Sequence, residues 1–398
     1  MPLLEPRDGL PPVVADGAAL AEVVRRFAEG TGPVAVDAER ASGYRYGQRA
    51  YLVQLRRSGA GTALIDPIAV PDLTALDAAL AETEAVFHAA SQDLPCLTEV
   101  GLRPHRLFDT ELAARLLNYP RVGLGIMVET VLGLRLEKGY SAADWSTRPL
   151  PEDWLRYAAL DVEVLVDLRD ALEEQLSESG KLEWAREDFA AIAAAPPPAP
   201  RADPWRRTSG IHRVRTRRAL AVVRELWTAR DHIAADRDTA PGRVLPDAAI
   251  VAAATGAPRT AADLGRLQGF SGRGARRHLS AWFRAVSRAQ EMPDDDLPEA
   301  AVPSDGPPPA NRWADREPAA AARLAAARTA IAELGERHDI PVENLLQPDA
   351  LRRLAWSPPA DLTEESVAEF LRGRGARHWQ IELTTGPLTA ALESAATA

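Results

Sequence analysis

The sequence predicts a multidomain protein in which an α/β unit is followed by two small all-α units. Three observations support this fold class. Short apolar strands alternate with amphipathic helices in the first half of the chain, two proline-rich segments interrupt the chain after residue 192, and the charge changes sign at both of them. At roughly 100–200 residues per domain, a chain of 398 residues has room for two to four domains.

The two proline-rich segments mark the domain boundaries. Residues 193–204 read AAAPPPAPRADP, and residues 293–311 are rich in proline and acidic residues. Such stretches form semi-rigid spacers. The net charge is −12 over residues 1–190, +10 over 201–292 and −8 over the rest. These signals agree on units at 1–192, 205–292 and 312–398, joined by linkers at 193–204 and 293–311.

The first unit alternates strand and helix patterns. Strands are predicted at 32–40, 50–58, 62–67, 85–90 and 107–110, and helices at 71–82, 91–100, 111–118 and 154–176. The long last helix places Leu160, Val164 and Leu168 on one stripe. The second and third strands are so close that they form a hairpin, so we expect a mixed sheet covered by helices.

The second and third units have helical patterns throughout. In the second, helices are predicted at 212–235 and after the glycine-rich turn 269–274, and Thr260 with Asp263 resembles a capping box. In the third, helices are predicted at about 317–338, 343–356, 362–372 and 375–394.

Composition excludes several classes of protein. The single cysteine, Cys96, rules out a disulfide scaffold and nearly rules out a thiolate zinc site, and the histidines form no H-E-x-x-H pair. No apolar run approaches the roughly 18 residues of a membrane span, and the N-terminal segment lacks the pattern of a secretory signal. We therefore expect a cytoplasmic protein with no membrane partner and no nucleotide cofactor.

Acidic residues at strand ends are the candidate functional site. Asp37 and Glu39 end an apolar strand, and their spacing of two puts both side chains on one face. Asp93 follows the strand predicted at 85–90, and Tyr157 and Asp161 are four apart on the long helix. Catalytic residues gather where strands of an α/β sheet end, so four carboxylates from three segments could converge there.

Each of these residues also has an ordinary structural interpretation. Asp37 and Glu39 could be a solvated strand end, and Asp93 could be an acid favoured by a helix dipole. Tyr157 could be a packed tyrosine beside a solvated Asp161. The order of the segments along the chain favours the functional interpretation.

The segments VDAERASGYRYGQRAYLVQL, FHAASQDLPCL and YAALD resemble, in order and spacing, the three exonuclease motifs of the ribonuclease D family. That family belongs to the tyrosine subgroup of the DEDD superfamily of 3′–5′ exonucleases, and the resemblance covers residues 32–175. The second unit resembles the helicase-and-ribonuclease-D C-terminal (HRDC) domain, and the third resembles a diverged second copy. The resemblance implies an RNase H-like (DnaQ-like) fold and two Mg²⁺ or Mn²⁺ ions.

The resemblance assigns roles to the acids. Asp37 and Glu39 match the first motif, Asp93 the second, and Tyr157 with Asp161 the third. Hard divalent ions prefer carboxylate oxygens, and a two-metal site clamps the attacking and leaving oxygens of a displacement. We expect Asp37 to bridge both ions, Glu39 and Asp161 to hold the ion that activates water, and Asp93 to support the other. Tyr157, with an ordinary pKa near 10, would orient the attacking water.

Neighbours of the acids are candidate substrate contacts. Ala38 and Arg40 stand where the family often has threonine and phenylalanine, so we expect them to touch the terminal nucleotide. His88 could approach the substrate, or be a packed or hydrogen-bonded histidine. Asp109 could be a fifth acid, but its position before a helix favours an N-cap.

The second unit is the candidate nucleic-acid surface, because a charge of +10 over 92 residues is typical of polyanion binding. The candidate contacts are all arginines near the two ends of the unit: Arg213, Arg215, Arg217, Arg218, Arg273, Arg276 and Arg277. The glycine-rich turn could present amides to a phosphate or simply connect helices. The arginines could instead form a solvated surface.

Together with these patterns, the resemblance implies a metal-dependent 3′–5′ exoribonuclease that releases 5′-nucleoside monophosphates. The resemblance implies RNA 3′ ends, such as those of tRNA precursors, as substrate. A 3′–5′ DNA exonuclease and a catalytically inactive RNA-binding adaptor are the alternatives. The complete set of four acids and Tyr157 argues against the adaptor. A monomer is the default expectation.

Overall fold

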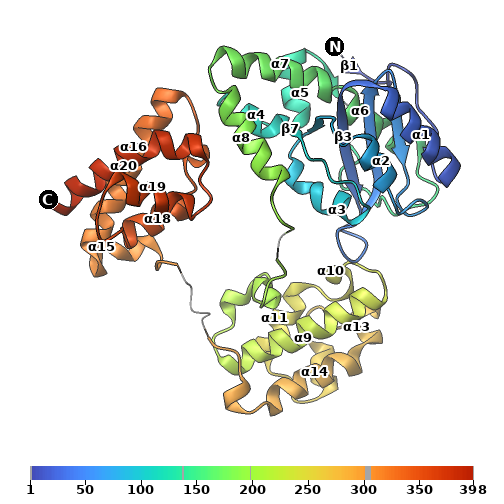
Figure 1. Cartoon of the computed structure of the whole chain (residues 1–398). Coiled ribbons are helices and arrows are strands. Elements are labelled where there is room, and N and C mark those ends of the chain that lie inside the picture. Colours follow the sequence, from blue (N-terminus) through green and yellow to red (C-terminus); the bar gives the residue numbers. More distant parts are fainter. Residues whose placement is uncertain (1, 137–138, 198, 301–305, 398) are drawn as a thin grey trace.

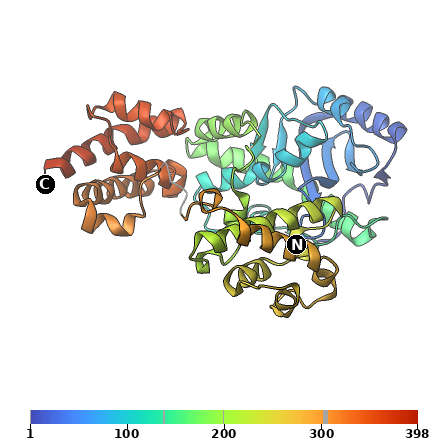
Figure 2. The same cartoon turned by 90° about the horizontal axis from the view of Figure 1, so that it is seen from below.

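A computed structural model describes residues 2–136, 139–197, 199–300 and 306–397. Figure 1 shows an α/β unit, a helical unit below it, and a second helical unit at the side of α7 and α8, and Figure 2 shows the same arrangement from below. Within the described part of the chain, no helix combines the length and the hydropathy needed to cross a membrane.

The central sheet of the first unit is mixed, as predicted. Its strand order is β2-β5-β4-β3-β6-β7, in which β4 is antiparallel to both β3 and β5 and the remaining pairs are parallel. The strands are β2 (Val13–Val14), β3 (Thr31–Arg40), β4 (Ala50–Ser58), β5 (Gly61–Ile65), β6 (Ala85–Phe87) and β7 (Leu107–Asp109). A separate two-stranded pair joins β1 (Pro2–Leu3) to β8 (Arg135–Leu136).

Helices cover both faces of this sheet. They are α1 (Gly17–Glu29), α2 (Thr74–Ala79), α3 (Leu94–Glu99), α4 (Thr110–Leu116), α5 (Leu124–Leu132), α6 (Glu152–Glu163), α7 (Leu165–Glu178) and α8 (Leu182–Ala193). Val34, Val36 and Ala38 of β3 join the main core with Phe27 of α1, whereas the alternate residues of β3 face α6. The strand therefore turns its acidic positions toward α6.

The long helix predicted at 154–176 is two helices. The chain breaks at Val164, where φ is −107° and ψ is −7°, so α6 ends at Glu163 and α7 begins at Leu165. Neither glycine nor proline marks the break, and a β-branched valine weakens a helix only slightly. The predicted stripe of Leu160, Val164 and Leu168 is buried in the core as expected.

The second unit is all-α. Its helices are α9 (Arg217–Asp236), α10 (Pro241–Val244), α11 (Asp247–Gly256), α12 (Ala261–Arg266), α13 (Arg273–Arg277) and α14 (Leu279–Glu291). Thr216 caps α9, and the predicted cap Thr260 accepts a hydrogen bond from the backbone N–H of Asp263 at the start of α12. Trp282 and Phe270 are fully buried in its own core.

The third unit is also all-α. Its helices are α15 (Trp313–Arg316), α16 (Pro318–His338), α17 (Val342–Leu345), α18 (Pro348–Trp356), α19 (Glu364–Arg372) and α20 (His378–Thr397). The helix predicted at 343–356 is interrupted before Pro348, because the residue preceding a proline is disfavoured in helical geometry. Thr363 and Ser366 form a capping box at the start of α19.

The third unit packs on the first. Trp184 of α8 stacks on Trp379 of α20, with ring centroids 5.1 Å apart and planes 16° from parallel. The buried Nζ of Lys181 donates to the carbonyls of Leu116 and Asp339, at 2.9 and 2.8 Å. Aromatic stacking and buried hydrogen bonds connect α8 to the third unit, so the third unit is part of the framework of the first.

The second unit contacts the loop between β3 and β4. The backbone N–H of Ala240 donates to the carbonyl of Tyr44 at 2.9 Å, and Arg243 lies over the Tyr44 ring, 4.1 Å from its centroid. The Tyr46 hydroxyl donates to Asp231 at 3.1 Å. This loop begins directly after the strand that carries Asp37 and Glu39, so the second unit is held next to the acidic end of β3.

Candidate active site and metal centre

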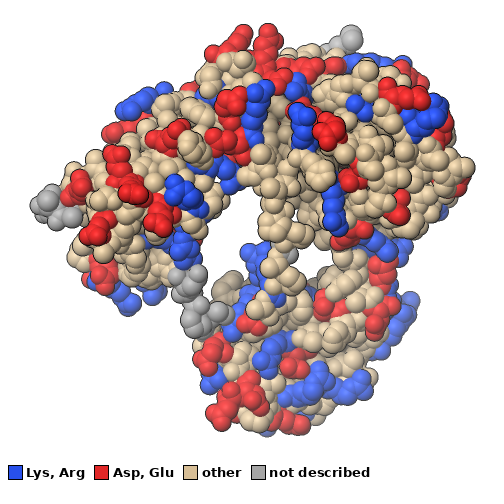
Figure 3. Space-filling model, in the orientation of Figure 1, with Lys and Arg blue, Asp and Glu red and all other residues tan. Residues whose placement is uncertain are grey.

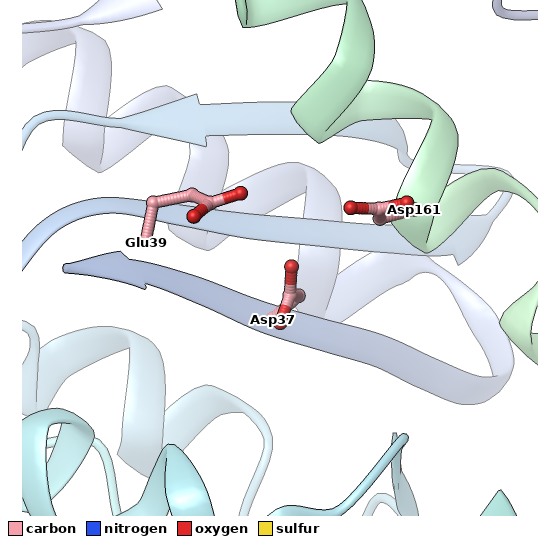
Figure 4. Close-up of side chains that lie close together, drawn as sticks. All are labelled: Asp37, Glu39 and Asp161. Carbon is pink, nitrogen blue, oxygen red and sulfur yellow. The ribbon is translucent and has the colours of Figure 1, made fainter. Parts of the chain in front are cut away.

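Three of the predicted acids form one cluster. Asp37 and Glu39 project from the same face of β3, and Asp161 projects toward them from α6 (Figure 4). One carboxylate oxygen of each residue lies within 4.8 Å of the other two. The strand period of two supplies one pair, and the packing of α6 across the sheet supplies the third acid.

Asp93 lies beside this cluster and is not one of its three members. It precedes α3, its side chain is buried, and its Oδ1 is 3.7 Å from Nη2 of Arg40. Burial raises the pKa of Asp93 to about 8, and the negative charge of Asp37 acts in the same direction. The charge of Asp37 therefore acts on Asp93 as well as on the other acids of the cluster.

Burial perturbs the whole set of carboxylates. It raises the pKa of Glu39 to about 10, and the charges of Asp37, Asp161 and Asp93 contribute in the same sense. Burial also raises the pKa of Asp37, and burial with the charge of Asp37 raises the pKa of Asp161 well above its usual range. Such shifts in a compact cluster are typical of functional sites.

This donor set suits divalent cations. All the donors are carboxylate oxygens, which hard cations prefer, and a cation would relieve the mutual repulsion that raises their pKa values. Bound there, a divalent cation supplies Lewis-acid chemistry and lowers the pKa of a water ligand. Asp37, Glu39, Asp161 and Asp93 are the side chains that would hold it.

Tyr157 stands on α6 one turn before Asp161. Its ring meets Tyr140 edge-on, with centroids 5.9 Å apart and planes at 81°. Burial and the charges of Asp161 and Glu39 raise the pKa of Tyr157. The hydroxyl therefore stays protonated at neutral pH and can donate a hydrogen bond, which suits orientation of a water and not proton abstraction.

The aromatic wall around Tyr157 was missed in the sequence. Residues 139–150 pack over α6, with Trp145 fully buried and 5.5 Å from Trp154, measured between ring centroids. The signal available was the cluster of aromatic residues Tyr140, Trp145 and Trp154 next to the third motif. These residues pack in one cluster with the ring of Tyr157.

Three further predictions concern the neighbours of the acids. Asp109 accepts hydrogen bonds from the N–H groups of Glu111 and Leu112, so it is the N-cap of α4, as predicted. His88 Nδ1 lies 2.9 Å from the Thr110 hydroxyl, so His88 is hydrogen-bonded within the protein, which was one of the two alternatives for it. Ala38 is 6% exposed in the core on the opposite face of β3, so its methyl group offers no surface to a nucleotide.

The arginines of the second unit divide into two groups. Arg217 donates to the carbonyls of Leu297 and Pro298, and Arg218 donates to those of Ala289 and Met292, so both stabilise the segment after α14. The other predicted arginines have exposed side chains: Arg213, Arg215, Arg273, Arg276 and Arg277. Figure 3 shows basic side chains over the part of this unit that contains α13.

Comparisons with known proteins agree with this geometry. A family model described as 3′-5′ exonuclease matches residues 12–177, an HRDC domain model matches 219–286, and a model described as 3′ to 5′ exonuclease C-terminal domain matches 306–392. Ribonuclease D of Gluconacetobacter diazotrophicus is 32% identical over 299 residues, which cover 73% of this chain and 72% of that protein.

Two solved structures match nearly the whole chain. A protein from Bifidobacterium adolescentis is 37% identical, with a TM-score of 0.91 over 98% of this chain and 99% of that one. RNase D of Escherichia coli, described as an exoribonuclease involved in structured RNA processing, is 27% identical, with a TM-score of 0.70 over 96% of this chain and 98% of that one.

The mixed sheet, the acidic cluster on β3 and α6, and the tyrosine one turn away define a 3′–5′ exonuclease of the DEDD class with a helical HRDC region. The chain belongs to the ribonuclease D family and is a 3′–5′ exoribonuclease that uses divalent metal. The predicted fold class, family and enzyme class are confirmed.

Proposed function

We propose that this enzyme trims structured RNA, such as tRNA precursors, from the 3′ end and releases 5′-nucleoside monophosphates with two Mg²⁺ or Mn²⁺ ions. The convergence of Asp37, Glu39 and Asp161, with Asp93 at their edge, is the observation that supports the proposal most directly. The Escherichia coli relative is described as an exoribonuclease involved in structured RNA processing, which supports the choice of a structured RNA.

The acids would share the two ions unequally. Asp37 belongs to the cluster with Asp161, and its charge raises the pKa of both Asp161 and Asp93, so Asp37 is the side chain that would bridge both ions. Glu39 and Asp161 would hold the ion next to the attacking water, and Asp93 would support the ion at the leaving oxygen. The Tyr157 hydroxyl would orient the water, and the phosphate of the terminal nucleotide would meet Arg40.

The second unit would capture the body of the RNA. Five arginines of this unit are exposed and form no ion pair within the described part of the chain: Arg213, Arg215, Arg273, Arg276 and Arg277. Free guanidinium groups bind phosphate oxygens with paired hydrogen bonds. The acidic surfaces of the other units would repel a polyanion, so the basic unit supplies the attraction.

Digestion of matched substrates tests the proposed function. We expect the full-length protein to shorten a 3′-tailed structured RNA stepwise from its 3′ end in Mg²⁺ or Mn²⁺, to release 5′-monophosphates, and to stop in EDTA. A DNA of the same sequence should be cut more slowly, because RNA carries the 2′-OH. Equal or faster cutting of the DNA would support the DNA exonuclease instead, and 3′-monophosphate products would contradict the mechanism.

A charge-neutralising triple variant tests the basic surface. Each phosphate contact on a single strand contributes about −0.7 to the slope of log affinity against log salt. The triple variant Arg273→Gln, Arg276→Gln, Arg277→Gln should flatten that slope by about 2 and weaken binding to a long RNA. Affinity should be measured at several salt concentrations with a metal that does not support cleavage.

A second triple variant controls for net charge. Arg328, Arg337 and Arg372 are exposed on the third unit, and their replacement by glutamine changes the total charge by the same amount. We expect this variant to keep the salt slope of the wild-type protein. Equal slopes for all three proteins would show that the arginines near α13 are only a solvated surface.

A further inference from the structure

A glutamine without a partner lies in the middle of the sheet next to the acids. Gln54 of β4 is fully buried, with 0% exposure, and both its Nε2 and its Oε1 lack a hydrogen-bond partner among the described residues. A buried amide without partners costs free energy, so natural proteins rarely keep one without a reason. The sequence pattern YLVQL shows it as the one polar residue of an apolar strand centre.

The sheet register places Gln54 directly opposite Asp37. The two residues are cross-strand partners in the antiparallel pair of β3 and β4, so their side chains lie on the same face. Directly opposite residues have Cβ atoms about 4.5–5.5 Å apart. That face is the one covered by α6, which carries Asp161.

The other neighbours of Gln54 within the sheet on this face offer it no hydrogen bond. Leu64 is its partner on the opposite side, in β5, and Leu52 precedes it on the same face of β4; both are fully buried. Arg56, the next residue on this face, is engaged by Thr62 at 2.8 Å and by Glu163 at 3.1 Å. Among its neighbours within the sheet, Asp37 is therefore the polar group left to the amide.

We propose that Gln54 is a positioning residue of the metal site, whose amide N–H donates to the Asp37 carboxylate when the site holds divalent cations. The inference rests on the metal site proposed above. A carboxylate that bridges two cations keeps lone pairs directed away from them, and an N–H donor on its far side fixes its orientation. Outer partners of metal ligands act in this way, and their loss commonly weakens metal binding.

The substitution Gln54→Met distinguishes this role from a structural one. Methionine has nearly the same length and removes only the amide. If Gln54 serves the metal site, the full-length Q54M protein should bind Mn²⁺ about 10–100-fold more weakly, measured by calorimetry or electron paramagnetic resonance. Its Tm without metal should be equal to or higher than that of the wild type, because an unpartnered buried amide has been replaced by an apolar group.

Leu52→Met is the matched control. Leu52 is equally buried, lies on the same face of β4 and is opposite Glu39, so the variant introduces the same side chain one position along that face. Its Mn²⁺ affinity should equal that of the wild type. Unchanged Mn²⁺ affinity in Q54M, whatever its Tm, would overturn the proposal.

Two outcomes separate this proposal from the metal site itself. If the wild-type protein failed to bind Mn²⁺, the metal site would be wrong, whereas equal binding by wild type and Q54M would contradict only the role of Gln54. Should Q54M fail to fold, Gln54→Asn keeps an amide but withdraws it by one methylene. We expect weakened Mn²⁺ binding in that variant too, and wild-type affinity there would overturn the proposal.

Discussion

Asp161→Asn is expected to abolish RNA cleavage while the protein remains folded. The substitution keeps the shape of the side chain and removes one of the three carboxylates within 4.8 Å of one another. The substitution should impair the metal-dependent cleavage step, because an amide is a much poorer ligand for a hard cation than a carboxylate is. The measurement is single-turnover cleavage in saturating Mg²⁺. Activity within about tenfold of wild type would remove Asp161 from the metal site.

The same variant should stabilise the metal-free protein at alkaline pH. Burial and the charge of Asp37 raise the pKa of Asp161, so the folded state holds a proton that the unfolded chain releases above about pH 4. Ionisation of Asp161 therefore destabilises the metal-free fold as the pH rises. In EDTA at pH 8, the variant should have a higher Tm than wild type, and the difference should disappear toward pH 4. A lower Tm at pH 8 would contradict the repulsion argument.

Tyr157→Phe is expected to lower kcat by about 10²–10⁴-fold with little change in RNA affinity. The variant keeps the ring that packs edge-on against Tyr140 and removes only the hydroxyl next to Asp161. Steady-state kinetics on a short RNA separate the two parameters. A loss confined to KM would make Tyr157 a substrate-binding surface.

Tyr140→Phe is the control for that prediction. It removes a hydroxyl from the other ring of the same aromatic pair. Tyr140 lies before α6, whereas Tyr157 is one helical turn from Asp161. We expect kcat close to that of the wild type. Comparable losses in both variants would indicate a general disturbance of the aromatic wall instead of a specific role for the Tyr157 hydroxyl.

Local patterns predicted the elements that carry the acids. The period-two spacing of Asp37 and Glu39 and the helical spacing of Tyr157 and Asp161 depend only on neighbouring residues, and both hold in the structure. The N-cap role of Asp109 was predictable for the same reason. Convergence of the strand with α6 was predictable through the resemblance to known motifs, since spacing within a segment says nothing about its distance from another.

Features that depend on packing were not predictable from patterns. The break at Val164 has no glycine or proline signal, and the two arginines that bind carbonyls after α14 look in sequence like their exposed neighbours. In the sequence, Gln54 is only a polar residue within an apolar strand. The register of the sheet shows that it lies opposite Asp37. Each of these features is determined by a contact between residues far apart in the chain.

The stack of Trp184 on Trp379 has a consequence for synthesis of the protein. The two tryptophans are separated by about 195 residues. At a synthesis rate of about 5–20 residues per second, roughly 10–40 s pass between the synthesis of Trp184 and that of Trp379. During that interval, the Trp184 side of α8 is an uncovered apolar face on a nascent chain. The newly made enzyme is therefore a candidate for chaperone binding at that face until α20 has left the ribosome and packed on α8.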